Sequence, residues 1–184
     1  PKIEFDPDQA AQLLAEAGYP QGKGFPKLKL LYNTSEAHQR IAEAIQQMWQ
    51  NNLKIQIELI NEEWKVYLST QQKMEYQVSR AGWIGDYNDP NTFLDMWLTG
   101  GGNNYTGFAN NEFDRLIEAA GQEADRQKRF KLFEEAEAIL LDEMPVIPIY
   151  HYTSKYLANP KVKGWYPTIL NHHPYKHVSI SPED

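Results

Sequence analysis

Arg80-Ala-Gly-Trp-Ile-Gly-Asp-Tyr-Asn-Asp-Pro90 is the stretch where a strand-like segment gives way to a turn. The strand-like run is Tyr76-Gln-Val-Ser-Arg-Ala-Gly82, and a helical pattern begins near Asn91. In open α/β sheets, ligands bind where strands end and the chain turns. A tryptophan, a carboxylate and flexible backbone lie within a few residues here, so the stretch suits a ligand with apolar surface and positive charge.

Two strand and helix pairs precede this stretch. Residues 27–32 form a predicted strand, and residues 55–59 alternate strictly between apolar and polar, which predicts a strand with one buried face. A helix is expected after each of them, the second over residues 61–72. Right-handed crossovers then place three strands in one largely parallel sheet. The predicted fold class is α/β, a mixed sheet flanked by helices.

Beyond Pro90 the pattern becomes mainly helical. Residues 91–98 predict a short helix and residues 99–104 a flexible glycine-rich loop. Two packing helices follow, with apolar faces formed by Phe113, Leu116, Ile117 and Ala120, and by Phe130, Phe133, Ala136 and Leu140. Residues 144–152 are strand-like, but their prolines favour an edge or irregular strand. The tail from Thr153 shows no core of its own.

Composition excludes several classes of function. The 184 residues carry a net charge of -7, which disfavours binding to nucleic acid. The absence of cysteine excludes disulfides, thiolate zinc sites and cysteine nucleophiles. No apolar run approaches the roughly 18 residues of a membrane span. The start, Pro1-Lys2-Ile-Glu-Phe, resembles neither an initiator nor a signal peptide, so we expect a piece of a longer chain.

Metal and cofactor sites are disfavoured by their spacing. The turn begins like a calcium loop, but Pro90 takes the place of a ligand and Asn91 that of the required glycine. The histidines near the C-terminus, which are His172, His173 and His177, lack a nearby carboxylate and are interrupted by Pro174. We expect no metal and no cofactor.

Nucleophilic catalysis lacks a supporting motif. Ser35 lies at a strand-to-helix turn with His38 nearby, but helix capping explains this serine. There is no Gly-x-Ser-x-Gly elbow, and the glycines at 100–102 neither follow a strand nor open a helix. The pattern alone leaves two residues undecided: Trp83 is either a core aromatic or a ligand contact, and Asp86 is either a turn residue or a binding carboxylate.

The sequence resembles the oligopeptide-binding proteins of bacterial ABC importers, the extracellular solute-binding protein family 5, over nearly its whole length. The segments that carry the resemblance are Arg80 to Pro90, Phe93-Leu94, Asn103-Asn104, Pro145-Val-Ile-Pro-Ile-Tyr150, Leu31-Tyr-Asn-Thr-Ser35 with His38, and Glu63-Trp64. The resemblance implies a two-lobed protein that closes on an extended peptide. Residues 1–152 would form the C-terminal lobe, and residues 153–184 would return to a first lobe that this sequence does not contain.

The resemblance also implies roles for individual residues. Asp86 matches the carboxylate that pairs with the peptide's α-amino group, since a buried ammonium needs a partner. Gly82, Trp83 and Ile84 match the segment whose backbone runs beside the peptide, an added-strand mode that reads few side chains. Ile84 replaces a smaller residue of some relatives, which could narrow one pocket.

Four further positions match ligand contacts of the family. Trp64 and Tyr152 match aromatic residues that line pockets, while Arg80 and His38 match cationic groups that answer peptide carboxylates. Gln71 departs from the pattern, because some relatives have an arginine there that faces the ligand.

The expected function is therefore peptide capture for import, not catalysis. The implied partners are an oligopeptide, the transmembrane permease subunits and the first lobe, and the implied location is the periplasm or a lipid anchor on the outer face of the cytoplasmic membrane. Two alternatives stay open: another solute in the same fold, such as a dipeptide, a nickel chelate or a sugar, and an α/β hydrolase.

Overall fold

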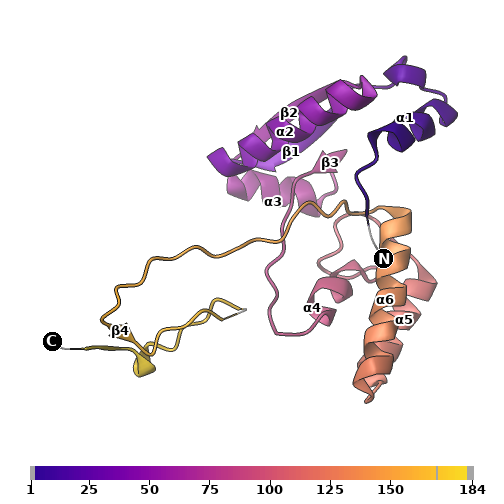
Figure 1. The fold of residues 1–184 in the computed structure, drawn as a ribbon. Helices are drawn as coiled ribbons and strands as arrows, with labels where there is room; N and C mark the ends of the chain where they lie inside the picture. The colour runs from indigo at the N-terminus through magenta and orange to yellow at the C-terminus, as the bar shows by residue number, and fades with distance from the viewer. Residues whose placement is uncertain (1–2, 169, 182–184) are drawn as a thin grey trace. The chain divides into compact units, whose positions relative to one another are not determined.

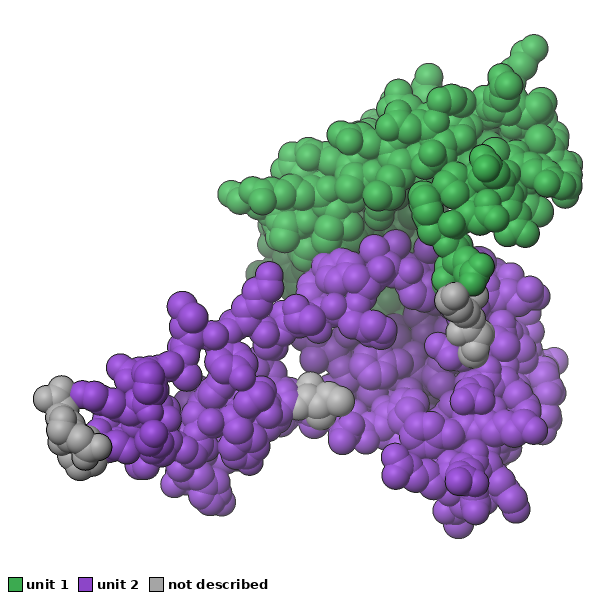
Figure 2. All heavy atoms as spheres, in the orientation of Figure 1, with its two compact units in different colours: residues 1–82, 102–109 green, residues 83–101, 110–184 purple. Residues whose placement is uncertain are grey.

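A computed structural model of the chain describes residues 3–168 and 170–181. Pro1 and Lys2, where we expect the break from a longer chain, lie outside the described residues. The chain forms two compact units (Figure 2). Unit 1 comprises residues 1–82 and 102–109, and unit 2 comprises residues 83–101 and 110–184. Each unit is described separately below.

Unit 1 begins with helix α1 (Pro7–Glu16). The Asp6 side chain accepts a hydrogen bond from the backbone N–H of Gln9 at 2.9 Å, and Pro7 occupies the first turn, where its missing N–H costs nothing. A short 3-10 helix, η1 (Pro20–Gly22), then leads to the first strand.

Three parallel strands form the sheet of unit 1: β1 (Leu28–Asn33), β2 (Ile57–Glu62) and β3 (Val78–Ser79), in the order β2-β1-β3. Helix α2 (Glu36–Leu53) connects β1 to β2, and helix α3 (Trp64–Gln72) connects β2 to β3 (Figure 1). The predicted α/β class and parallel arrangement are confirmed.

The core of unit 1 lies between the sheet and α2. It contains Leu30, Tyr32, Ala42, Ile55 and Ile57, each at most 7% exposed. Successive strand residues point to opposite faces, so buried Leu31 belongs to the other face. Helix α3 contacts β1 and covers this second face. The sheet is thus covered on both sides, as a parallel sheet requires.

The boundary between β2 and α3 differs from the prediction. Asn61 and Glu62 extend the strand, because they pair with the last residues of β1, and the helix begins only at Trp64. Glu63 caps this helix, since its carboxylate accepts the Lys65 N–H at 2.9 Å. The third strand is also shorter than predicted and ends at Ser79. Long-range pairing, which a local pattern does not contain, sets these limits.

Unit 2 contains helix α4 (Asn91–Leu94), the 3-10 helix η2 (Asp95–Trp97), and the helices α5 (Asn111–Gln122) and α6 (Arg126–Glu143). Helices α5 and α6 pack side by side (Figure 1). Their buried residues are Phe113, Leu116, Ile117, Ala120, Phe133, Ala136 and Leu140, so the two predicted packing helices are confirmed. Phe130, which is predicted on the same packing face, is 37% exposed and lines an open groove instead.

The segment after α6 differs from its prediction. Residues 144–152 form no strand, which accords with prolines that cannot donate a ladder hydrogen bond. Farther on, β4 (Val162–Lys163) pairs antiparallel with β5 (Ser179–Ile180), and η3 (Tyr175–His177) lies between them. The ring of Trp165 contacts Tyr156 and stacks on His173. The tail therefore has a small aromatic cluster that its sequence did not predict.

Candidate functional site

The eight predicted ligand contacts divide between the two units. Unit 1 contains His38, Trp64, Arg80 and Gly82, and unit 2 contains Trp83, Ile84, Asp86 and Tyr152. The two sets are described in turn.

In unit 1, a polar pair lies at the carboxyl end of the sheet, where β1 leads into α2. His38 Nδ1 is 2.8 Å from Oδ1 of Asn33, the last residue of β1, which is 8% exposed. An amide oxygen can only accept a hydrogen bond, so this contact assigns the imidazole proton to Nδ1. Asn33 therefore fixes both the orientation and the tautomer of His38.

Arg80 follows β3 directly and reaches the same histidine. Its Nη1 is 3.5 Å from His38 Nδ1. Burial lowers the pKa of His38, and the positive charge of Arg80 lowers this pKa further, while the contact with Asn33 opposes the change. The neutral imidazole has one N–H, which it donates to Asn33, so the donors that a ligand would meet here come from Arg80. A carboxylate placed beside both side chains would accept from Arg80 and would favour the protonated imidazole, whose Nε2–H is a second donor. The structure thus brings the side chains of Arg80 and His38 into contact at the carboxyl end of the sheet.

Tyr67 on α3 supports this arrangement, and we did not predict it as part of the site. Its hydroxyl donates to the backbone oxygen of Arg80 at 2.6 Å, and the residue is 3% exposed. Burial raises the pKa of the hydroxyl, which stays a donor at neutral pH. A sequence signal existed, because Tyr67 lies one helical turn after Trp64, on the same side of α3.

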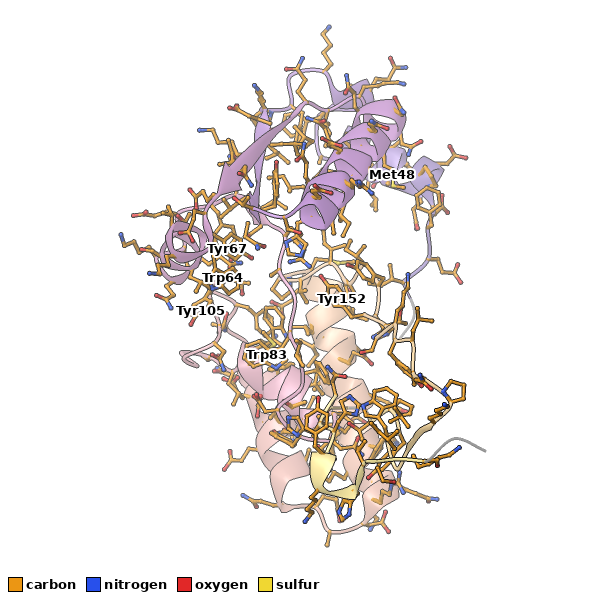
Figure 3. All side chains as sticks on the ribbon, turned by 90° about the vertical axis from the view of Figure 1, so that its left-hand side faces the viewer. Met48, Trp64, Tyr67, Trp83, Tyr105 and Tyr152 are labelled. Carbon is orange, nitrogen blue, oxygen red and sulfur yellow. The ribbon has the colours of Figure 1, made fainter. Side chains whose placement is uncertain are left out.

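Trp64 presents an aromatic surface at the start of α3. It is 53% exposed and stacks on Tyr67, with ring centroids 5.6 Å apart and ring planes at 22° (Figure 3). Gln71, at the other end of α3, donates from Nε2 to Ser79 Oγ at 2.9 Å. Gln71, where the sequence departs from the family pattern, therefore connects α3 to β3 by a side-chain hydrogen bond.

In unit 2, the turn begins with two apolar side chains of different exposure. Trp83 is partly buried, and its indole Nε1 is enclosed without a hydrogen-bond acceptor among the described residues. Ile84 is 78% exposed. Neither residue is therefore a fully buried core side chain; Trp83 is labelled in Figure 3.

Asp86 is exposed and is fixed through its backbone. Its N–H donates to Oγ1 of Thr92 at 3.0 Å, and Thr92 is only 1% exposed. In the described part of the chain, no donor reaches the Asp86 carboxylate. A side-chain contact that stabilises the turn is made by Asp89, whose Oδ1 accepts the N–H of Asn91 at 2.9 Å.

The two aspartates that follow Asp86 have protein partners. Arg129 of α6 donates to Asp89 from Nη1 at 2.5 Å and from Nη2 at 2.8 Å. This contact lowers the pKa of Asp89. Asp95 Oδ2 accepts from the Tyr87 hydroxyl at 3.1 Å and from Asn91 Nδ2 at 2.9 Å. We did not predict Arg129, since its 40-residue separation from Asp89 leaves no local signal.

An open groove of about 640 Å³ lies beside the turn. Its lining residues are Gly85, Tyr87, Asn88, Asp89, Pro90, Phe93, Arg126, Arg129, Phe130 and Leu170. Asp86, Trp83 and Ile84 do not line it, so the predicted contacts lie outside this groove.

Tyr152 lies in the segment without regular structure that follows α6. It is 58% exposed, and its ring meets that of Tyr150 edge to face at 4.9 Å. Figure 3 shows it among the labelled side chains.

The tail histidines make local contacts. The two ring nitrogens of His173 lie 3.0 Å from the backbone oxygen of Tyr166 and 2.9 Å from Oδ1 of Asn171. Within residues 3–168 and 170–181, no group of three or more His, Cys, Asp or Glu side chains is arranged to hold a metal ion. No helix in the same residues is both long and apolar enough to span a bilayer.

A parallel sheet that is covered on both faces and carries Arg80, His38 and an exposed Trp64 near its carboxyl end is typical of an α/β ligand-binding domain. Comparison with known proteins defines it further. The family description "Bacterial extracellular solute-binding proteins, family 5 Middle" matches residues 1–105. The chain belongs to this family.

Two named relatives illustrate the likeness. The oligopeptide-binding protein OppA of Bacillus subtilis is 45% identical over 152 residues, which are 82% of this chain and 28% of the relative. A crystal structure of the periplasmic oligopeptide-binding protein OppAIV of Borrelia burgdorferi superposes with a TM-score of 0.87 at 39% identity, covering 98% of this chain and 37% of that one. The structural match confirms the predicted binding-protein fold.

A third comparison includes a ligand. The structure of Haemophilus influenzae OppA in complex with the peptide RPPGFSPFR gives a TM-score of 0.81 at 34% identity, covering 96% of this chain and 35% of that one. This chain therefore spans about a third of the length of the relatives it matches.

Proposed function

We propose that this chain forms the peptide-binding lobe of a two-lobed protein that captures extended oligopeptides for a bacterial ABC importer. Residues 1–152 would form the lobe, and residues 153–184 would return to the other lobe. Membership of the solute-binding family and the peptide-bound relative support this function.

The observation that carries the proposal is the state of Asp86. The turn contains Asp86 and Asp89, and Asp95 follows at the start of η2. Arg129 donates to Asp89, while Tyr87 and Asn91 donate to Asp95. Asp86 retains an exposed carboxylate on a backbone that buried Thr92 anchors. An ammonium enclosed between two lobes loses its hydration and needs such a partner. Asp86 would thus bind the peptide's α-amino group and set its register.

The other predicted ligand contacts would bind other parts of the same peptide. The exposed backbone of residues 82–84 would add the peptide as an extended strand, so that main-chain hydrogen bonds give affinity with little side-chain selection. Arg80 and His38 would receive a carboxylate of the peptide, whose negative charge pairs with Arg80 and favours the protonated imidazole beside it. Trp64 and Tyr152 would provide apolar surface for side chains.

The mechanism would be capture without chemistry. The two lobes would close around the peptide by a hinge motion, and the permease subunits would distinguish the closed from the open state. Such a protein works outside the cytoplasmic membrane, either in the periplasm or on a lipid anchor. The Borrelia relative is named as a periplasmic protein.

Calorimetry on the complete two-lobed protein tests the role of Asp86. Tetra-alanine should bind, and N-acetyl-tetra-alanine should bind at least about tenfold more weakly, because acetylation removes the charge that Asp86 pairs with. The variant Asp86→Asn should lose most of this discrimination. Asp142→Asn, at an exposed position on α6, is the matched control and should retain it. Equal affinities of the wild-type protein for both peptides would overturn the proposal.

Two further measurements separate the other functions. Mass spectrometry of ligand that copurifies with the complete protein distinguishes peptides from a dipeptide, a nickel chelate or a sugar. Incubation with tetra-alanine, followed by chromatography, should recover the peptide intact, and cleavage would support a hydrolase instead.

A further inference from the structure

Three aspartates lie within ten residues of one another, and only one of them can be the carboxylate that binds the ammonium group of a ligand. Asp86 and Asp89 lie in the turn and Asp95 follows at the start of η2, so an ammonium group could bind to any of three nearby like charges. A site that reads one end of a peptide needs a single carboxylate in a fixed place. The structure shows how the turn achieves this.

The fixed point of the turn is the pair of Asp89 and Arg129. The two N–H···O contacts use both oxygens of the carboxylate and both terminal nitrogens of the guanidinium. The side chains are 26% and 24% exposed, so water screens the pair only partly. A bidentate contact of this kind fixes geometry as well as charge.

Arg129 is itself held by two further contacts. Its Nε donates to the backbone oxygen of Ala120 in α5 at 3.0 Å, and its guanidinium carbon lies 4.6 Å from the ring centroid of Phe133. Both Ala120 and Phe133 are buried between α5 and α6. The ion pair therefore connects the turn to the packed helices α5 and α6, which are more rigid than the turn alone.

The ion pair of Asp89 and Arg129 is connected to Asp86 through a few residues of the turn. Asp89 is three positions after Asp86 and also accepts the N–H of Asn91, while the neighbouring Thr92 receives the N–H of Asp86. Gly85 lies close to the same threonine, since a side-chain carbon there would be 3.0 Å from Thr92 Cγ2. The backbone at Asp86 is thus held from both sides.

We propose that Arg129 is a positioning residue for ligand binding. It neutralises Asp89 and locks the turn, so that Asp86 alone presents its carboxylate to an ammonium ligand. The inference rests on the proposed function of Asp86 and adds a residue that does not touch the peptide.

The test measures the discrimination between tetra-alanine and N-acetyl-tetra-alanine by calorimetry on the complete protein. Arg129→Lys keeps the charge but loses the fork geometry. It should lower the affinity ratio of the two peptides about tenfold, through weaker binding of the free amine. The affinity for the acetylated peptide should stay within about twofold of the wild-type value. A purely structural role would lower the melting temperature and leave the ratio unchanged.

Two variants make the result decisive. Asp89→Asn breaks the same ion pair from the other side and should lower the ratio similarly, which keeps the test valid if Arg129→Lys does not fold. Arg115→Lys is the matched control, because Arg115 also forms a double contact with a carboxylate, Glu112, but within α5. It should leave the ratio unchanged.

The outcomes distinguish this inference from the proposed function. If the wild-type protein does not discriminate between the two peptides, both ideas fail. If it discriminates and Asp86→Asn abolishes this, while Arg129→Lys and Asp89→Asn keep the wild-type ratio, the role of Asp86 stands and that of Arg129 is overturned.

Discussion

The hydroxyl of Tyr67 donates a hydrogen bond of 2.6 Å to the backbone oxygen of Arg80. This contact connects the middle of α3 to the residue that follows β3, where the chain leaves the sheet. It therefore holds the backbone from which the Arg80 side chain extends toward His38. One buried hydroxyl thus contributes both to the stability of unit 1 and to the geometry of the contact between Arg80 and His38.

Tyr67→Phe should destabilise the protein by about 1–2 kcal/mol, because it leaves a buried carbonyl oxygen without its donor. Urea denaturation at neutral pH measures this change. Tyr175→Phe is a suitable control, since Tyr175 is 76% exposed and should lose almost nothing. Equal stability of Tyr67→Phe and the wild-type protein would show that water replaces the lost donor.

Thr92 offers a second test of the turn. Thr92→Val removes the oxygen that accepts the Asp86 N–H but keeps the shape, so it should cost about 1–3 kcal/mol of stability and weaken binding of tetra-alanine. Thr92→Ser keeps the oxygen and serves as the matched variant. Calorimetry and urea denaturation check both effects, and equal peptide affinity in the two variants would speak against an anchoring role.

The ion pair of Asp89 predicts a pH dependence of stability. Arg129 lowers the pKa of Asp89 in the folded protein, so the unfolded state binds the proton more readily. The stabilisation is present above the unfolded pKa of about 3.9 and is lost as the pH falls through the lower folded pKa. The difference in unfolding free energy between the wild-type protein and Asp89→Asn should therefore shrink below about pH 4. A constant difference down to pH 2 would contradict this account.

His38 predicts proton uptake on binding. Burial, followed by the charge of Arg80, lowers its pKa in the free protein. A peptide carboxylate beside the imidazole would raise this pKa, so binding near pH 6 should take up part of a proton. Calorimetry in buffers of different ionisation enthalpy measures this uptake. His38→Gln should abolish it, whereas unchanged uptake would assign the proton to another group.

The sequence predicted the fold well where the signals are local. Strict alternation of apolar and polar residues predicted β2, and the apolar faces of residues 113–120 and 133–140 predicted the packed helices α5 and α6. The end of β2 was missed, because Asn61 and Glu62 join the strand through pairing with β1 and not through their own preference. Strand character near Pro145 was likewise misleading, since no partner strand is present among the described residues.

The candidate site likewise contains residues that the local sequence predicted and residues that it did not. The turn around Asp86 and the aromatic Trp64 were predicted from a contiguous motif and a family resemblance. The residues that hold them in place, Tyr67 and Arg129, act on backbone or side chains 13 and 40 positions away. Such contacts arise only when helices pack, so a local reading of the sequence does not contain them.

The most direct test of the central claim is a crystal structure of the complete two-lobed protein with tetra-alanine bound. We expect the peptide to lie extended along the backbone of residues 82–84, with its α-amino nitrogen about 2.7–2.9 Å from an oxygen of Asp86. A peptide that runs in the opposite direction, or an amino group that is held by another carboxylate, would contradict the account.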